Sequence, residues 1–173
     1  VEKGDKVASF AWNQHRHLES YFAVPCIGAC LHMVNIRLSA EHITYIINHA
    51  EDKVLIIDED LVPLIEEVQD QLKTVQHYII MCDGELPITT LPSVLSYEEL
   101  LTSSNEAFEF PTDIDENTVA SMCYTSATTG NPKGVEYTHR ALVLHSLMSS
   151  MVDTFAISER DTVMPIVPMF HVN

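Results

Sequence analysis

The chain has 173 residues, of which 46% are hydrophobic and 20% charged, and its formal net charge is −16 at pH 7. These proportions are ordinary for a globular α/β protein that holds one sizeable core. The charge argues against nucleic acid or an anionic membrane as a main partner, because both favour clustered lysine and arginine and the chain has nine such residues. No apolar run approaches the roughly 20 residues that span a bilayer. We therefore expect a cytoplasmic protein without a transmembrane segment, and peripheral attachment to a membrane stays open.

Short apolar runs recur along the chain and predict strands. Runs of this kind, bounded by turn residues, are typical of strands that are buried on both faces. Strands are expected at residues 6–11, 28–35, 54–57, 77–82, 119–124, 135–137 and 162–167.

Amphipathic segments between these runs predict helices. The clearest begins after Ser39, which is a good capping residue, and carries isoleucines at the i, i+3, i+4 spacing of a helix face. An earlier helix is expected from a cap at Asn13 to about Pro25, and a third over residues 61–72 with Pro63 in its first turn. The face of the earlier helix carries Leu18, Tyr21 and Phe22.

Two further helices are predicted in the second half of the chain. Ser96 and Glu99 have the spacing of a capping box, and Thr138 is expected to cap a helix on which His145 packs against apolar neighbours. Residues 83–118 are rich in proline, serine, threonine and acidic residues and are expected to be mostly loop, with a soft subdomain boundary. Strands that alternate with helices predict an α/β fold with a mostly parallel sheet covered on both faces.

The four cysteines do not predict a disulfide framework. Cys26, Cys30 and His32 could supply soft metal ligands, but no second Cys/His pair lies nearby to close a zinc site. We interpret these cysteines as small buried apolar side chains and expect no protein-held metal.

The segment from Tyr124 to Arg140 contains the chemistry of the chain. Small and hydroxyl-bearing residues let backbone N–H groups approach an anion and donate hydrogen bonds of their own, and a lysine adds a compact positive charge. The segment leaves the end of a predicted strand, where open α/β sheets bind ligands. Its polyphosphate-binding candidates are Thr125, Ser126, Thr128, Thr129, Gly130 and Lys133.

A solvated turn is the alternative interpretation of such a cluster. Two common phosphate loops do not match, because Lys133 lies between Pro132 and Gly134 rather than after the glycine of a Walker loop, and no Gly-x-Gly-x-x-Gly occurs. The full order is tyrosine, hydroxyl run, glycine, Asn-Pro-Lys-Gly, a short apolar stretch and Thr-His-Arg. This order closely resembles the signature loop of the adenylate-forming (AMP-binding) superfamily.

Other segments extend the resemblance over nearly the whole chain. Gly4-Asp5-Lys6-Val7-Ala8 is similar to the first strand of that family, and Tyr21-Phe22-Ala23-Val24-Pro25 to the helix that follows. Asn35-Ile36-Arg37-Leu38-Ser39 and Tyr45-Ile46-Ile47-Asn48-His49 resemble the next helix and its approach. Pro168-Met169-Phe170-His171-Val172-Asn173 is similar to a second motif in the form found in fatty-acid–CoA ligases.

The resemblance implies a ligase that activates a medium- or long-chain fatty acid, first to acyl-AMP and then to acyl-CoA, with ATP, Mg²⁺ and coenzyme A as small-molecule co-substrates. A ligase for an aryl or carrier-protein-bound acid, or a degenerate non-catalytic module, remains an alternative, and homo-oligomerisation stays open. Family members are longer, so residues 1–173 are expected to be an N-terminal fragment, without the C-terminal domain and inactive alone.

The same resemblance implies roles for individual residues. Thr125, Ser126, Ala127, Thr128, Thr129 and Gly130 would surround the phosphates of ATP, Lys133 would act catalytically on the departing pyrophosphate, and His171 would line the acyl or adenylate pocket. The family has glycine where this chain has Ala127. If that position requires positive φ or close approach to phosphate, alanine there costs about 1 kcal/mol or more.

Overall fold

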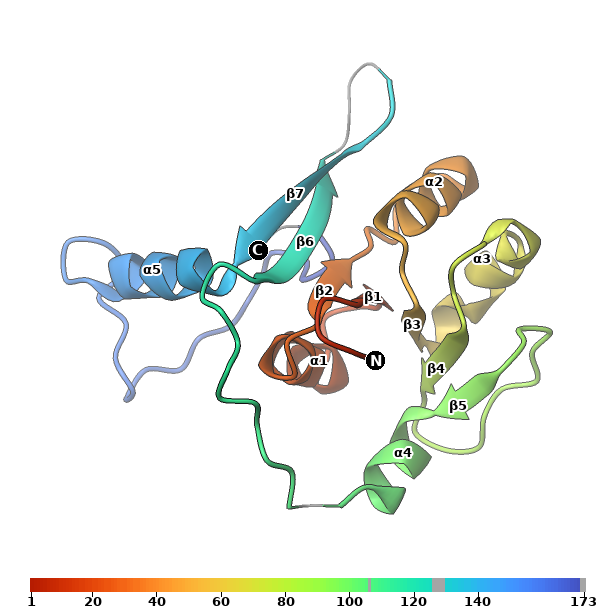
Figure 1. Cartoon of the computed structure of the whole chain (residues 1–173), viewed down its shortest axis with the longest axis horizontal. Coiled ribbons are helices and arrows are strands. Elements are labelled where there is room, and N and C mark those ends of the chain that lie inside the picture. The colour runs from red at the N-terminus through yellow and green to blue at the C-terminus, as the bar shows by residue number, and fades with distance from the viewer. Residues whose placement is uncertain (106, 126–129, 172–173) are drawn as a thin grey trace.

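The computed structural model describes residues 1–105, 107–125 and 130–171 (Figure 1). Within these residues, seven strands form one sheet in the order β5-β4-β3-β1-β2-β6-β7. Neighbouring strands are parallel except β6 and β7, which are antiparallel, so the predicted mostly parallel sheet is confirmed. The strands are β1 (Lys6–Phe10), β2 (Cys30–Met33), β3 (Val54–Asp58), β4 (His77–Met81), β5 (Val94–Ser96), β6 (Val119–Thr125) and β7 (Lys133–Thr138).

Helices cover both faces of the sheet, also as predicted (Figure 1). Helices α2 (Ala40–Ala50) and α3 (Val62–Glu66) pack on one face, and α1 (His15–Cys26) and α4 (Tyr97–Ser103) lie on the other. Helix α5 (His139–Ser150) follows β7 and lies beside the sheet. Two short 3₁₀ helices, η1 (Glu59–Leu61) and η2 (Gln69–Gln71), flank α3.

Two apolar cores result from the alternation of side chains along the strands. In β1, Ala8 and Phe10 belong to the core under α2 and α3, whereas Val7 belongs to the core under α1. Because successive strand residues point to opposite faces, a strand buried on both sides is apolar at nearly every position. This explains why the parallel strands are recognisable in the sequence as continuous apolar runs.

Helix ends follow local chemistry at several predicted positions. The Ser39 side chain accepts a hydrogen bond from the N–H of His42, and the Thr138 side chain accepts one from Ala141. At the C-terminal end of α2, Glu51 has a left-handed conformation with φ of 61°. At the end of α1, Gly28 has φ of 80°, a conformation that glycine adopts without strain.

The prediction for the first helix was wrong in two details. Gln14, rather than Asn13, precedes α1, and its side chain makes no capping bond. Leu18 and Phe22 are exposed, and His17 and Val24 face the sheet instead. Tyr21 is partly buried against the core as predicted, so Leu18 and Phe22 are the residues that were misplaced. Their pattern did not locate the whole buried face, because His17, hydrogen-bonded to Ser9, occupies part of it.

The helix predicted at residues 61–72 is divided into α3 and a separate 3₁₀ turn, η2. Ile65 and Val68 still face the core. Residues three apart share a face in both helix types, so the apolar spacing could not distinguish a continuous helix from a divided one.

One strand prediction in the second half was wrong, and one short strand was not predicted. Residues 162–167 form no strand, and Val163, Met164, Ile166 and Val167 are exposed. A short apolar run does not suffice for a strand, because a neighbouring strand must supply hydrogen bonds. Conversely, the three-residue β5 lies in the region expected to be mostly loop, where it extends the sheet beside β4.

Strand β1 lies between β2 and β3, with the chain continuing outward in both directions. This is the switch point of an open parallel sheet, and ligands of such sheets bind beyond the carboxyl ends of the strands. Among the described residues, no helix is long and apolar enough to cross a membrane.

Candidate functional site

The predicted phosphate loop connects β6 to β7. Thr125 ends β6 and pairs with Lys133, the first residue of β7, across the antiparallel ladder. The Thr125 hydroxyl also donates a hydrogen bond of 3.4 Å to the carbonyl oxygen of Lys133. Ser126, Ala127, Thr128 and Thr129 lie outside the described residues. The two ends of the loop are thus held side by side at the carboxyl end of β6.

Gly130 follows the hydroxyl-bearing run with φ of 89°. L-residues rarely adopt this conformation, whereas glycine adopts it readily. The position therefore favours glycine because of the backbone turn, and a side chain there would strain the return of the chain into β7.

Lys133 is exposed at the start of β7 and makes no ion pair with any described residue. Four other basic residues, Lys3, Arg16, Lys53 and Arg140, are paired with carboxylates. An unpaired ammonium next to a hydroxyl- and glycine-rich loop is available to an anionic ligand.

The base of the loop is built around Tyr124, which is buried at the end of β6. Its hydroxyl lies 2.7 Å from Nδ1 of His49 on α2. Burial raises the pKa of Tyr124, with a smaller contribution from the nearby Asp52 carboxylate, so the hydroxyl is protonated at neutral pH. No role was predicted for His49, because nothing in its local sequence pattern marked the contact with Tyr124.

A fully buried polar pair lies under Tyr124. His32 Nδ1 is 2.7 Å from Asp52 Oδ2, and the His32 ring is 5.1 Å from the Tyr124 ring between centroids. Burial raises the pKa of Asp52, while the interaction with His32 opposes that shift. Of the proposed soft ligands, His32 is therefore engaged by a carboxylate, Cys30 is buried and Cys26 is exposed.

The Pro168–His171 segment is anchored at the same edge of the sheet. Phe170 is buried, its ring is 6.1 Å from that of Trp12, and the Arg37 guanidinium lies 5.7 Å from its centroid. The Asn13 side chain accepts a hydrogen bond of 2.7 Å from Met169 N–H and donates one of 3.1 Å to the carbonyl of Val167. Asn13 thus binds a distant segment instead of capping α1.

His171 is exposed beyond this turn, and its N–H donates to the carbonyl of Pro168 at 3.1 Å. It does not follow a strand, as the sequence analysis expected, because residues 162–167 form none. The turn lies beyond the carboxyl end of β1, whose parallel neighbour β2 pairs with β6. The turn and the phosphate loop therefore occupy the same edge of the sheet.

A polar hollow of about 390 Å³ lies farther along this edge, at the carboxyl ends of β1, β3 and β4. Asp58 accepts a hydrogen bond from the Trp12 N–H at 2.7 Å, and burial raises the pKa of its carboxyl group. Arg16 pairs with Asp83 and Glu98, each at 2.6 Å. Because these polar groups already have hydrogen-bond and ion-pair partners within the chain, they hold the loops at this edge of the sheet in place.

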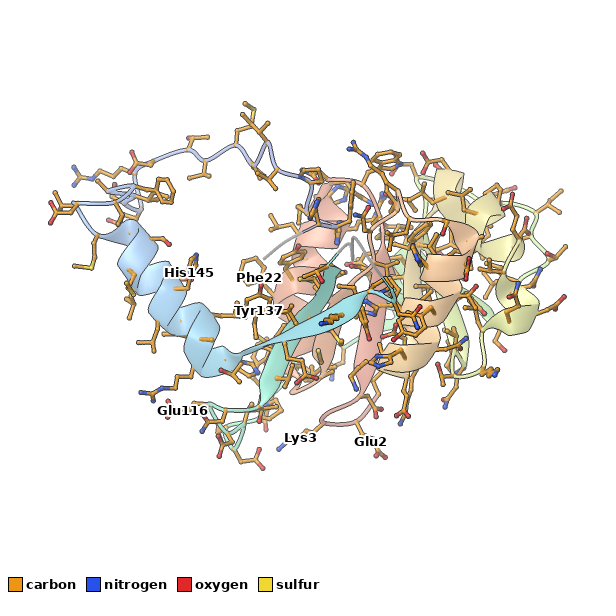
Figure 2. The ribbon with its side chains drawn as sticks, turned by 90° about the horizontal axis from the view of Figure 1, so that it is seen from above. Glu2, Lys3, Phe22, Glu116, Tyr137 and His145 are labelled. Carbon is orange, nitrogen blue, oxygen red and sulfur yellow. The ribbon has the colours of Figure 1, made fainter. Side chains whose placement is uncertain are left out.

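His145 was expected to pack against apolar neighbours, but it is exposed on α5 (Figure 2). Several large apolar residues of the same helix are exposed as well, namely Val143, Leu144, Leu147 and Met148. The apolar character of the helix could not indicate burial, because in this chain the helix has little to pack against.

A family model described as AMP-binding enzyme matches residues 1–173. The long-chain-fatty-acid–CoA ligase of Thermus thermophilus is 53% identical over 173 residues, which is the whole of this chain and 30% of that protein. The medium-chain-fatty-acid–CoA ligase of Ectopseudomonas oleovorans is 47% identical over 98% of this chain and 31% of its own length. The chain belongs to the AMP-binding enzyme family.

The solved structure of a long-chain-fatty-acid–CoA ligase from Archaeoglobus fulgidus is also similar to this chain in fold. It matches with a TM-score of 0.84 and 27% sequence identity, over 99% of this chain and 32% of that one. The chain thus spans about a third of the length of the relatives that it matches, and its fold is that of the corresponding part of adenylate-forming enzymes.

Proposed function

We propose that the whole protein containing this chain is an acyl-CoA synthetase. It would activate a medium- or long-chain fatty acid with ATP to acyl-AMP, and then transfer the acyl group to coenzyme A. The observation that carries the proposal is the β6–β7 hairpin, whose described residues present the Thr125 hydroxyl, the glycine turn at Gly130 and the unpaired Lys133 at the carboxyl edge of the sheet. The names of the similar ligases support the class of acid.

The chemistry explains why such a hairpin is useful. A carboxylate is a poor acyl donor, so its oxygen attacks the α-phosphorus of ATP and the bond to the β-phosphate breaks. Negative charge collects on the pyrophosphate as it leaves, and fixed donors placed there stabilise the transition state. Thr125 and Gly130 would contact the β- and γ-phosphates, together with Ser126, Ala127, Thr128 and Thr129, and Lys133 would neutralise the departing charge. Mg²⁺ would enter with ATP as part of the substrate.

His171 is proposed to line the pocket for the acyl group or the adenylate. Its turn is fixed by the buried Phe170 and by two hydrogen bonds with Asn13, one donated and one accepted, at the same edge as the loop. A fatty acid there would present its carboxylate to ATP held by the hairpin. The remaining two-thirds of the relatives' length has no counterpart in this chain, so we propose that residues 1–173 alone are inactive.

The test is ATP–pyrophosphate exchange by the purified whole protein with acids from acetate to palmitate and an aryl acid such as benzoate. Exchange is expected to be fastest with medium- or long-chain fatty acids, followed by thioester formation when coenzyme A is added. Fastest exchange with benzoate would instead identify an aryl-acid ligase. If none of the acids supports exchange, the protein is a non-catalytic module. The 173-residue chain serves as a control, and turnover by it would contradict the proposed inactivity.

A further inference from the structure

The last buried residue before the phosphate loop contacts three separate elements. Tyr124 ends the buried part of β6, and its hydroxyl lies 2.7 Å from Nδ1 of His49 in the last turn of α2. The two rings meet edge to face, with 5.8 Å between centroids. The tyrosine therefore connects the first arm of the hairpin to a helix on the face of the sheet.

Gly134 completes the arrangement from the second arm. It is the register partner of Tyr124 and directly follows Lys133. A Cβ atom at this position would lie 3.3 Å from Cζ of Tyr124 and 3.3 Å from Cε of Met122. Such contacts are tighter than normal van der Waals separation, so the glycine leaves the space that the tyrosine ring occupies.

Packing alone does not hold the hydroxyl end of Tyr124. On one side, its ring lies against His32, which the buried Asp52 fixes at 2.7 Å. On the other side, a hollow of about 250 Å³ opens, with Lys6, Glu136 and His49 among its lining residues. A ring that borders open space can shift, so the hydrogen bond to His49 is the contact that specifies its position.

We infer that Tyr124 and His49 are positioning residues for the nucleotide. Their hydrogen bond fixes the first arm against α2, and the Tyr124 ring over Gly134 fixes the second arm, which carries Lys133. The pair thereby sets the position of the Lys133 ammonium relative to the Thr125 hydroxyl at the end of β6. This inference rests on the proposed function, because it assigns the pair to the binding of ATP phosphates.

The experiment measures KM for ATP, KM for the fatty acid and kcat in the exchange reaction of the whole protein. Tyr124→Phe keeps the ring and removes the hydroxyl, and His49→Ala removes its partner. Losing one net hydrogen bond corresponds to a rise in KM for ATP of about three- to tenfold, with KM for the fatty acid unchanged. His49→Asn, whose amide nitrogen can replace Nδ1, should restore most of the affinity, and Gly134→Ala should raise KM for ATP by displacing the ring.

The double variant Tyr124→Phe, His49→Ala should be no worse than either single variant, because both remove the same bond. His42→Ala, on the same helix about two turns earlier, is the matched control and should leave all constants unchanged. Thermal unfolding of every variant separates misfolding from mispositioning. A folded Tyr124→Phe protein with unchanged KM for ATP, or with equal changes in KM for ATP and KM for the fatty acid, would overturn this inference and leave the proposed function standing. Absence of exchange in the wild type would overturn the proposed function and the inference with it.

Discussion

Two regions of the molecule use apolar residues differently. On α2, Ile43, Ile46 and Ile47 are buried against the parallel strands, whereas Leu144, Leu147 and Met148 on α5 are exposed. Both helices have a side-chain cap at the N-terminus and similar lengths. The comparison shows that helix formation is encoded locally, whereas burial depends on what the surrounding chain provides.

The largest expected effect is at the buried polar pair of the parallel region. Asp52→Ala leaves His32 without its partner in an environment where both side chains are fully buried. Removing one member of such a pair typically lowers the free energy of unfolding by about 3 to 5 kcal/mol. Urea denaturation of the 173-residue chain measures the change, and a loss below about 1 kcal/mol would show that the pair is poorly coupled.

Core truncation sharpens the comparison between the two helices. Ile46→Ala removes a completely buried side chain and should lower the free energy of unfolding by about 3 kcal/mol. Leu147→Ala, on α5 with 63% of the leucine exposed, should change it by about 0.5 kcal/mol or less. Similar losses in the two variants, measured by urea denaturation, would mean that α5 is packed in solution.

Capping residues test the same difference at a smaller scale. Ser39→Ala removes the cap of α2 and should lower the global free energy of unfolding by about 1 kcal/mol. Thr138→Ala removes the equivalent cap of α5, and its effect should be confined to local opening of that helix. Amide hydrogen exchange distinguishes global from local opening. Equal loss of protection throughout the chain in both variants would contradict this expectation.

The smallest expected effect concerns acid stability. Glu66 accepts hydrogen bonds from Thr90 N–H and the Thr89 hydroxyl, both at 2.7 Å, and these bonds lower its pKa. A carboxylate with a depressed folded pKa contributes stability above its unfolded value, near 4.3, and loses it as pH falls. Glu66→Gln should therefore flatten the loss of stability below pH 4.5. Glu159→Gln, at an exposed position, is the control. If the free energy of unfolding of the two variants depends on pH in the same way, the proposed linkage to Glu66 is excluded.

The sequence was most informative where local chemistry determines structure. Ser39 and Thr138 cap helices as predicted, and the apolar runs of β1, β3 and β4 form parallel strands. Sequence patterns could not show that residues 162–167 lack a strand partner or that Leu18 points outward. Both depend on contacts between segments far apart in the chain.

The candidate site was only partly predictable for the same reason. The hydroxyl run, Gly130 and Lys133 indicate phosphate chemistry by residue type and order. His49 and Asn13 could not be found in this way, because their partners lie 75 and more than 150 residues further along the chain. Asn13 was therefore interpreted as a helix cap, a common use of that residue.

The central claim is that the turn of the β6–β7 hairpin, together with Lys133 at the start of β7, binds the departing phosphates of ATP. The most direct measurement compares ATP–pyrophosphate exchange by the whole protein and its Lys133→Ala variant, with Lys73→Ala as a matched lysine control. Loss of one charge-assisted contact should lower kcat/KM for ATP by an amount equivalent to about 1 to 3 kcal/mol, while the control remains at wild-type level. Unchanged exchange kinetics in a folded Lys133→Ala protein would show that Lys133 is an ordinary surface lysine, and would contradict the claim.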